Sequence, residues 1–202
     1  MQEEVVRSFR TKVYLLLSAL FRYPSRDAEK FKFTPKILDK RFNRTLRSLK
    51  ELLKLSFYNE TYEVEFTRLF INAYPKLPCP PYESFYKEGR LMGDCTIRLR
   101  ELYRSFGVAV AKEMQDNISV ELEFMGILTK MENSTREYER TRVIKAEEIM
   151  LREHLAGWVS KFSSCVNREA NVELYRKAAL LLSHFIEEDL VYVQELQDRV
   201  IP

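Results

Sequence analysis

The chain contains few of the residues on which catalytic and metal-binding sites are usually built. Among its 202 residues are two histidines, three cysteines and five glycines. The histidines, His154 and His184, fall inside apolar helical patterns, and neither belongs to a His-Glu-x-x-His or Cys/His spacing that would hold zinc. We therefore expect no bound metal, and histidines that pack or lie on the surface rather than take part in catalysis.

Glycine-built phosphate sites are missing as well. Neither Gly-x-x-x-x-Gly-Lys nor Gly-x-Gly-x-x-Gly occurs, and there is no Gly-x-Ser-x-Gly turn to carry a nucleophilic serine. Two pairs of acids, Glu63 with Glu65 and Glu121 with Glu123, are spaced by two residues, which points them to different sides of a helix. An enzyme is therefore the weakest of the functions considered, and the sequence predicts no catalytic residue and no cofactor.

Long apolar runs are absent too. No stretch approaches the ~20 apolar residues of a membrane-spanning helix, so we expect no stable membrane insertion. The charged opening segment predicts a first helix rather than a secretion signal. The cysteines are odd in number and form no Cys-x-x-Cys pair, which favours reduced thiols over a disulfide framework. Together these absences predict a cytoplasmic protein.

What the sequence does have is helical periodicity along most of its length. It predicts an all-α, single-domain globule over residues 1–202, with about seven helices and one long proline-rich loop at 72–89. The expected helices lie near 5–23, 35–53, 60–70, 90–106, 117–131, 151–166 and 172–193. Asp116 is expected to cap the fifth of these and Gly107 to end the fourth. The apolar residues on two faces of the fifth predict a central helix, and the polar segment 132–140 predicts a turn.

Positive charge is concentrated in one segment. The net charge is only +3, but residues 30–54 hold nine lysines and arginines against two acids, Asp39 and Glu51. A solvated helix face explains this pattern, and a phosphate-binding patch is the alternative. A nucleic-acid-binding regulator that uses this face is therefore the rival to the function developed below.

The proline-rich loop contains the segment CPPYESFYKEGRLMGD, residues 79–94. Proline fixes its own φ and restricts the residue before it, so the PCPP run holds an extended backbone at little further cost in entropy. Such a loop presents Tyr82, Phe85 and Tyr86 in a fixed arrangement, which suits recognition of a peptide. The alternative is that this loop is a lid that covers the core and binds no peptide, because the same residues would suit that role.

Four motifs in a fixed order carry a family resemblance. They are YEVEFTRLFI at 62–71, PCPPYESFY at 78–86, DNISVELEFM at 116–125 and EEIMLREHLAGWVSKFSSCV at 147–166. Over this half of the chain the sequence resembles the TorD/DmsD/NarJ family of cytoplasmic chaperones for molybdoenzymes. Members of that family carry a Glu-x-x-x-Leu-Phe element, a Pro-Tyr-Glu-Ser-x-Tyr loop, a Pro-Asp-His-Ile-x-x-Glu-Leu-x-Phe-Met helix start and a His-Leu-x-x-Trp-x-x-x-Phe segment.

The resemblance can be followed residue by residue. The matching positions are Glu65, Leu69 and Phe70; Pro81, Tyr82, Glu83, Ser84 and Tyr86; Asp116, Ile118, Glu121, Leu122, Phe124 and Met125; and His154, Leu155, Trp158 and Phe162. Gln115 stands where the family has proline, and Asn117 where it has histidine. Because asparagine does not titrate near neutrality, a pH-linked or nucleotide-linked role of that histidine does not transfer to Asn117.

The resemblance implies a non-catalytic redox-enzyme maturation chaperone. Its expected partners are the twin-arginine leader peptide and/or the apo form of a molybdopterin oxidoreductase catalytic subunit, held until the cofactor is inserted. A leader offers two arginines and an apolar stretch, so its receptor needs acids beside an apolar aromatic groove. The expected peptide-binding residues are Pro81, Tyr82, Glu83, Ser84, Phe85, Tyr86, Asp116, Asn117, Ile118, Glu121 and Phe124.

Two further expectations concern the remaining parts of the chain. The basic segment should lie away from the groove, because it would repel a leader that carries arginines, and no nucleic acid is expected as a partner. The link at 107–117 is a candidate hinge for domain swapping, so both a monomer and a domain-swapped homodimer remain open.

Overall fold

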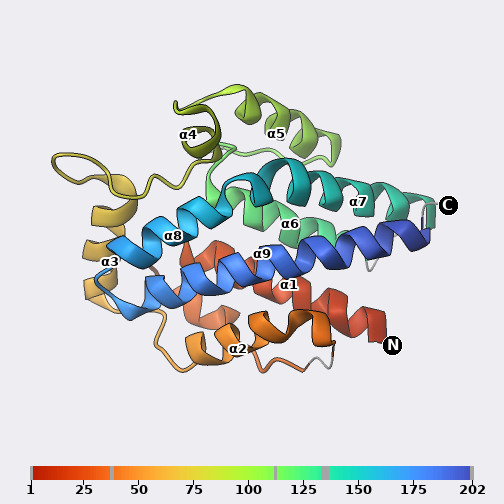
Figure 1. The fold of residues 1–202 in the computed structure, drawn as a ribbon, viewed down its shortest axis with the longest axis horizontal. Helices are drawn as coiled ribbons and strands as arrows, with labels where there is room; N and C mark the ends of the chain where they lie inside the picture. Colours follow the sequence, from red (N-terminus) through yellow and green to blue (C-terminus); the bar gives the residue numbers. More distant parts are fainter. Residues whose placement is uncertain (1, 37–38, 112, 133–136, 201–202) are drawn as a thin grey trace.

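The computed structural model describes residues 2–36, 39–111, 113–132 and 137–200, and it is built from helices packed around one core (Figure 1). The all-α prediction is confirmed, because these ranges contain no strand and only an isolated bridge between Tyr82 and Asn117. The α-helices are α1 (Gln2–Leu20), α2 (Asn43–Leu52), α3 (Glu60–Phe66), α4 (Glu83–Glu88), α5 (Asp94–Ser105), α6 (Ile118–Glu132), α7 (Glu137–Ile149), α8 (Val159–Glu169) and α9 (Glu173–Val200). Short 3-10 helices occur at Arg26–Phe31, Lys40–Phe42 and Leu155–Gly157, and π-helical turns occur at Thr67–Ile71 and Met150–His154.

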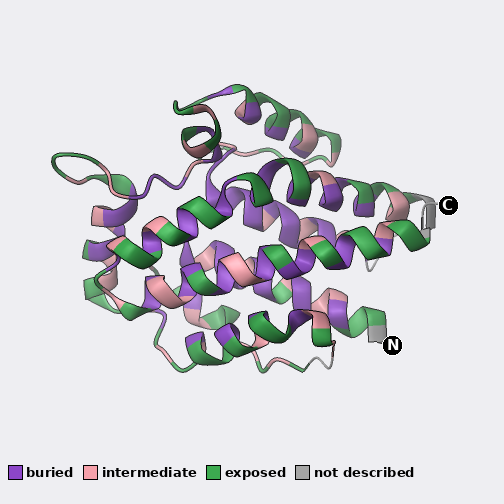
Figure 2. Cartoon of the chain, in the orientation of Figure 1, coloured by how far each residue is buried: buried purple, intermediate pink, exposed green. Residues whose placement is uncertain are grey.

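Helix α6 is the centre of the packing. It lies against α1 and α7, while α9 packs against α2, α7 and α8. Leu122, Met125 and Leu128 of α6 are fully buried, which confirms the prediction of a central helix from its two apolar faces (Figure 2). None of the helices in the described part of the chain is long and apolar enough to cross a lipid bilayer.

The described part of the chain contains more helices than the seven expected. One extra helix, α4, occupies residues 83–88 of the predicted loop, so the irregular segment ends at Tyr82. A second, α7, includes the end of the segment 132–140 that predicted a turn; residues 133–136 of that turn lie outside the described residues. The start of the second expected helix at Pro35 was also wrong, because α2 begins at Asn43.

The ends of α5 and α6 test the predicted helix signals. Gly107 follows α5 with a φ of 72°, as expected of a glycine that ends a helix. The cap of α6 is Asn117 and not Asp116: the Asn117 side-chain oxygen accepts hydrogen bonds from the backbone N–H of Ser119 at 2.9 Å and from its hydroxyl at 2.8 Å. Both residue types favour the cap position, so the sequence did not distinguish between neighbours. Asp116 is therefore free to cap a different helix, α4.

A disulfide overturns the prediction of three reduced thiols. Cys79, in the proline-rich segment, is bonded to Cys165 of α8, and their Cα atoms lie 5.9 Å apart. The bond closes a sequence separation of 86 residues, a loop for which the chain-entropy account gives about 4–5 kcal/mol of stabilisation. The number and local spacing of cysteines do not reveal a pairing that the tertiary fold creates. The third cysteine, Cys95, is free and buried.

A buried ionic cluster crosses the helix bundle around Arg10 of α1. Its guanidinium contacts Asp189 at 2.5 Å, Glu147 at 2.6 Å and Glu132 at 3.2 Å, and all four side chains are fully buried. The hydroxyl of Tyr14 also donates to Asp189. Burial, only partly offset by Arg10, raises the pKa of Glu147 to about 8. Arg10 thus joins α1 to α6, α7 and α9 through charge-assisted hydrogen bonds.

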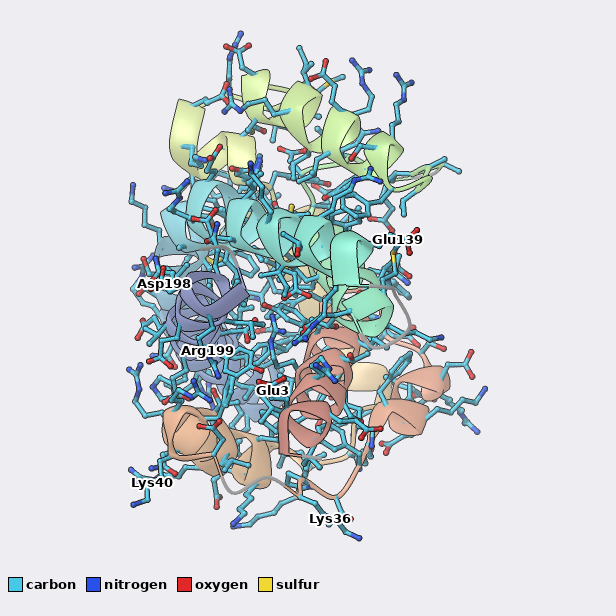
Figure 3. All side chains as sticks on the ribbon, turned by 90° about the vertical axis from the view of Figure 1, so that its right-hand side faces the viewer. Glu3, Lys36, Lys40, Glu139, Asp198 and Arg199 are labelled. Atoms are coloured by element: carbon cyan, nitrogen blue, oxygen red, sulfur yellow. A yellow bond between two sulfur atoms is a disulfide. The ribbon has the colours of Figure 1, made fainter. Side chains whose placement is uncertain are left out.

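The basic segment lies on the side of the molecule opposite α4 and α5 (Figure 1). Lys36 and Lys40 project from that end in the turned view (Figure 3). Several of its charges are paired with acids of α9: Arg41 contacts Glu195 at 2.5 Å, and Arg44 contacts Glu187 at 2.9 Å. This pairing weakens the positive surface on which a nucleic-acid-binding function would depend.

Candidate functional site

Two segments that are far apart in the sequence meet at the predicted site. The backbone N–H of Ile118 donates to the carbonyl of Pro81 at 2.9 Å, and the N–H of Glu83 donates to the carbonyl of Asp116 at 2.9 Å. Tyr82 and Asn117 form the antiparallel bridge between these two bonds. The start of α4 and the start of α6 are therefore held side by side, which brings together the second and third sequence motifs.

Asp116 holds the N-terminus of α4. Its Oδ2 atom accepts hydrogen bonds from the backbone N–H of Ser84 at 3.1 Å and from the Ser84 hydroxyl at 2.5 Å. Tyr82, the residue before α4, has no side-chain oxygen in a capping position, so Asp116 supplies the cap from another part of the chain. The Oδ1 atom of Asp116 is buried and accepts no hydrogen bond from the described residues.

Glu83 is the second carboxylate of the site, and it has two cationic or potentially cationic neighbours. The Nδ1 atom of His154 lies 2.9 Å from its Oε2 atom, and the ammonium of Lys87 lies 2.7 Å from its Oε1 atom. Glu83 is fully buried and His154 almost so. His154 is the last residue of the π-helical turn in the fourth motif, and π-turns often mark functional positions.

Glu121 is the third carboxylate, and neither of its oxygens accepts a hydrogen bond from the residues that the structure describes. Burial raises the pKa of Glu121 well above its usual value, and the neighbouring charges of Glu83 and Asp116 raise it further. Lys87 and the indole of Trp158 oppose this shift only in part. Leaving a buried carboxyl group without a partner is costly, so its position beside two other acids needs an explanation.

Aromatic rings lie on one side of the acids. Tyr86 stacks on the buried Trp158 with ring centres 5.5 Å apart, and Phe85 contacts Tyr86 edge to face at 5.2 Å. Phe85 is 42% exposed, whereas Phe124 is buried against Tyr103 at 4.5 Å. The apolar residues Trp158 and Phe162 lie in the core, as the sequence predicts.

The comparisons with known proteins agree with this arrangement. The family model described as nitrate reductase delta subunit matches residues 36–164, which include all four motifs except the last two residues of the fourth. The chain belongs to this family. It is 27% identical to the chaperone protein TorD of Vibrio cholerae over 97% of both chains. It is also 27% identical to the perchlorate reductase assembly chaperone protein of Dechloromonas aromatica, over 68% of this chain and 64% of that one.

A solved structure shares the fold as well. It comes from Archaeoglobus fulgidus, is assigned as a redox enzyme maturation protein, and covers 88% of this chain and 93% of its own, with a TM-score of 0.58 and 26% sequence identity. These similarities identify the chain as a redox-enzyme maturation chaperone of the nitrate reductase delta subunit family, a non-catalytic assembly factor.

Most residues of the candidate site are buried, whereas the sequence predicted acids beside an apolar aromatic groove. Of the predicted peptide-binding residues, the exposed one is Phe85; Tyr82 and Tyr86 are half-buried. The buried ones are Pro81, Glu83, Ser84, Asp116, Asn117, Ile118, Glu121 and Phe124. The structure therefore brings the predicted residues together and buries the three acids, of which Glu83 is the first residue of α4. Within the described ranges, no cluster of histidine, cysteine, aspartate or glutamate is arranged to hold a metal ion.

An apolar groove of about 400 Å³ lies next to the candidate site. It runs between the link that follows α5 and the exposed side of α6, and it is lined by Tyr103, Val108, Val110, Val120, Phe124 and Ile127 among others. Arg22 and Glu123 form a 2.5 Å ion pair at its edge. Phe124 is shared between this groove and the predicted peptide-binding set.

The sequence analysis did not predict that Lys87 and His154 would contact Glu83. The spacing of Glu83 and Lys87 by four residues is a helical ion-pair signal, but the segment was predicted to be a loop, so the signal was not used. His154 was matched to the fourth motif and interpreted as a packed or surface residue. Its contact with Glu83 spans 71 residues of sequence, which no local pattern reveals.

Proposed function

We propose that this chaperone binds the twin-arginine leader and/or the apo form of a molybdopterin oxidoreductase catalytic subunit in the cytoplasm, and holds it until the cofactor is inserted. The observation that carries the proposal is the buried cluster of Glu83, Asp116 and Glu121, in which three carboxylate oxygens accept no hydrogen bond from the described residues. Guanidinium groups offer five N–H donors in a fixed planar arrangement and are well suited to such oxygens.

The surroundings of the cluster support the same proposal. A leader contains an apolar stretch beside its arginines, and the groove lined by Val108, Val110 and Ile127 lies next to the acids through Phe124. Because Glu83, Asp116 and Glu121 are buried, we infer that α4 moves when a leader binds. A substantial minority of protein complexes rearrange a loop or order a segment on binding. The 107–117 link remains our proposed hinge, both for this movement and for a domain-swapped homodimer.

Two sets of substitutions test this function against the nucleic-acid-binding rival. Tyr82→Ala and Glu83→Gln are each expected to weaken leader binding by about tenfold, because they remove an aromatic contact or a charge-assisted hydrogen bond. The double substitution Lys40→Gln with Arg47→Gln, at exposed positions of the basic segment, should change leader affinity by less than about twofold. Fluorescence anisotropy with a labelled leader measures both.

The opposite pattern would favour the rival. If leader and duplex DNA affinity both depended on Lys40 and Arg47, and not on Tyr82 and Glu83, the basic segment would be the binding surface. Affinity for DNA would then fall steeply with salt, because binding releases condensed counterions.

A further inference from the structure

Lys87 enters the carboxylate cluster from the edge of the molecule. Its side chain is 24% exposed, whereas that of Glu83 is fully buried. The stem passes beside Gly157, and the ammonium donates to the Glu83 carboxylate at 2.7 Å and to the backbone carbonyl of Glu153 at 2.5 Å. One side chain of α4 is thus fastened both to the acid cluster and to the π-helical turn at Met150–His154.

The charge balance of the cluster is incomplete. Three buried carboxylates are grouped together, and Lys87 and His154 both contact Glu83. The Oδ1 atom of Asp116 and both oxygens of Glu121 accept no hydrogen bond from the described residues. The site therefore has acceptors for a ligand with several N–H donors, while the partly exposed ammonium of Lys87 occupies the Glu83 carboxylate.

Helices α4 and α5 contact each other and form one arm along a side of the bundle (Figure 1). Tyr86 of α4 and Tyr103 of α5 attach this arm to the bundle through Trp158 and Phe124. Glu88 of α4 accepts hydrogen bonds from the backbone N–H groups of Asp94 and Cys95 at the start of α5, both at 2.8 Å. These bonds lower the pKa of Glu88 to about 2. The Cys79–Cys165 disulfide fixes the chain just before the arm, and Asp116 fixes the start of α4 from the other side.

We propose that Lys87 is an autoinhibitory latch: in the unliganded chaperone its ammonium occupies the carboxylate position that a guanidinium of the leader takes, and leader binding displaces it into solvent. This inference rests on the proposed function and adds a regulation of the same site. The Lys87 ammonium partly neutralises the acids until a guanidinium displaces it. A guanidinium has five N–H donors and can pair with a carboxylate through two hydrogen bonds at once.

The first test compares leader affinity in three chaperone variants with the wild type. Lys87→Met and Lys87→Gln remove the competing ammonium and keep a side chain of similar length, so each is expected to bind a labelled twin-arginine leader about threefold to tenfold more tightly. Arg90→Met removes an exposed positive charge close to the same arm and is expected to change affinity by less than about twofold. This control separates displacement of the latch from a general loss of repulsion.

The second test measures displacement directly. Lysine labelling with an amine-reactive reagent, read by mass spectrometry, should be at least about threefold faster at Lys87 when the wild-type chaperone is saturated with leader. Labelling of Lys161, an exposed residue of α8, should stay unchanged.

The outcomes distinguish the latch from the proposed function. If the wild type binds the leader, but both Lys87 variants bind it no more tightly and Lys87 is not labelled faster, the latch is overturned and leader binding stands. If the wild type does not bind the leader at all, the proposed function fails and the latch fails with it.

Discussion

Replacing Arg10 with methionine is expected to lower the free energy of unfolding by about 3–5 kcal/mol, because it leaves buried acids without their cation. Arg10 contacts Asp189, Glu147 and Glu132, which come from three different helices. Methionine fills much of the same space but cannot donate a hydrogen bond. The acids must then either stay charged in the core or take up protons on folding, and both alternatives destabilise the native state.

Urea unfolding followed by circular dichroism measures this loss. Arg44→Met is the matched control, because Arg44 is half exposed and pairs with the exposed Glu187. Its second partner, the buried Glu188, keeps hydrogen bonds from the backbone N–H groups of residue 44 and Thr45, so the substitution should cost less than about 1 kcal/mol. If the free energy of unfolding of Arg10→Met were within about 1 kcal/mol of the wild-type value, the stabilising role of the ionic cluster around Arg10 would be contradicted.

The substitution Glu121→Gln is expected to weaken leader binding by about tenfold to a hundredfold, the cost of one charge-assisted hydrogen-bonding group. It should not weaken the fold. Burial and the neighbouring acids raise the pKa of Glu121 in the native state, so its contribution to stability is fully present at acidic pH and falls as pH rises above the unfolded-state pKa. Glutamine has no proton to lose, and the variant should unfold at the same or a higher temperature at neutral pH.

The pH dependence of leader binding gives a second measure of the same group. If a guanidinium binds ionised Glu121, binding releases a proton, and affinity should rise with pH by up to about tenfold per unit. The titratable and charged groups around it are Glu83, Lys87, Cys95, Tyr103, Asp116 and His154. Because these groups also respond to pH or to charge, the decisive comparison is the slope in the wild type against the slope in Glu121→Gln.

Glu101→Gln provides the control, since Glu101 is an exposed acid of α5. It should leave both the affinity and the slope nearly unchanged. A Glu121→Gln chaperone that binds the leader as tightly as the wild type, with the same pH slope, would remove Glu121 from the binding site.

Much of the fold could be predicted from the sequence because it depends on local patterns. The apolar spacing of α1, α6 and α9 follows from the helical period, and Gly107 ends α5 through a conformation that glycine adopts easily. The order of the four motifs also led to the pairing of 81–86 with 116–121 as one predicted site, and the structure places these segments in contact.

The features that the sequence did not reveal depend on the tertiary fold. Cys79 and Cys165 are separated by 86 residues, and the acids around Arg10 lie 122 to 179 residues away from it. Asp116 and Asn117 are both good capping residues, and only their surroundings decide that the first caps α4 and the second caps α6. The burial of Glu83, Asp116 and Glu121 was missed because the prolines and tyrosines predicted a loop where the short helix α4 forms.

The most direct test of the account is a titration of the purified chaperone with a fluorescent twin-arginine leader. A twin-lysine version of the leader and a duplex DNA are measured beside it, each at low and at moderate salt. The account predicts saturable leader binding that survives moderate salt and weakens about tenfold with lysine, because an ammonium cannot make the paired hydrogen bonds of a guanidinium. Equal binding of the two leaders, or binding of DNA alone with a steep loss of affinity in salt, would contradict it.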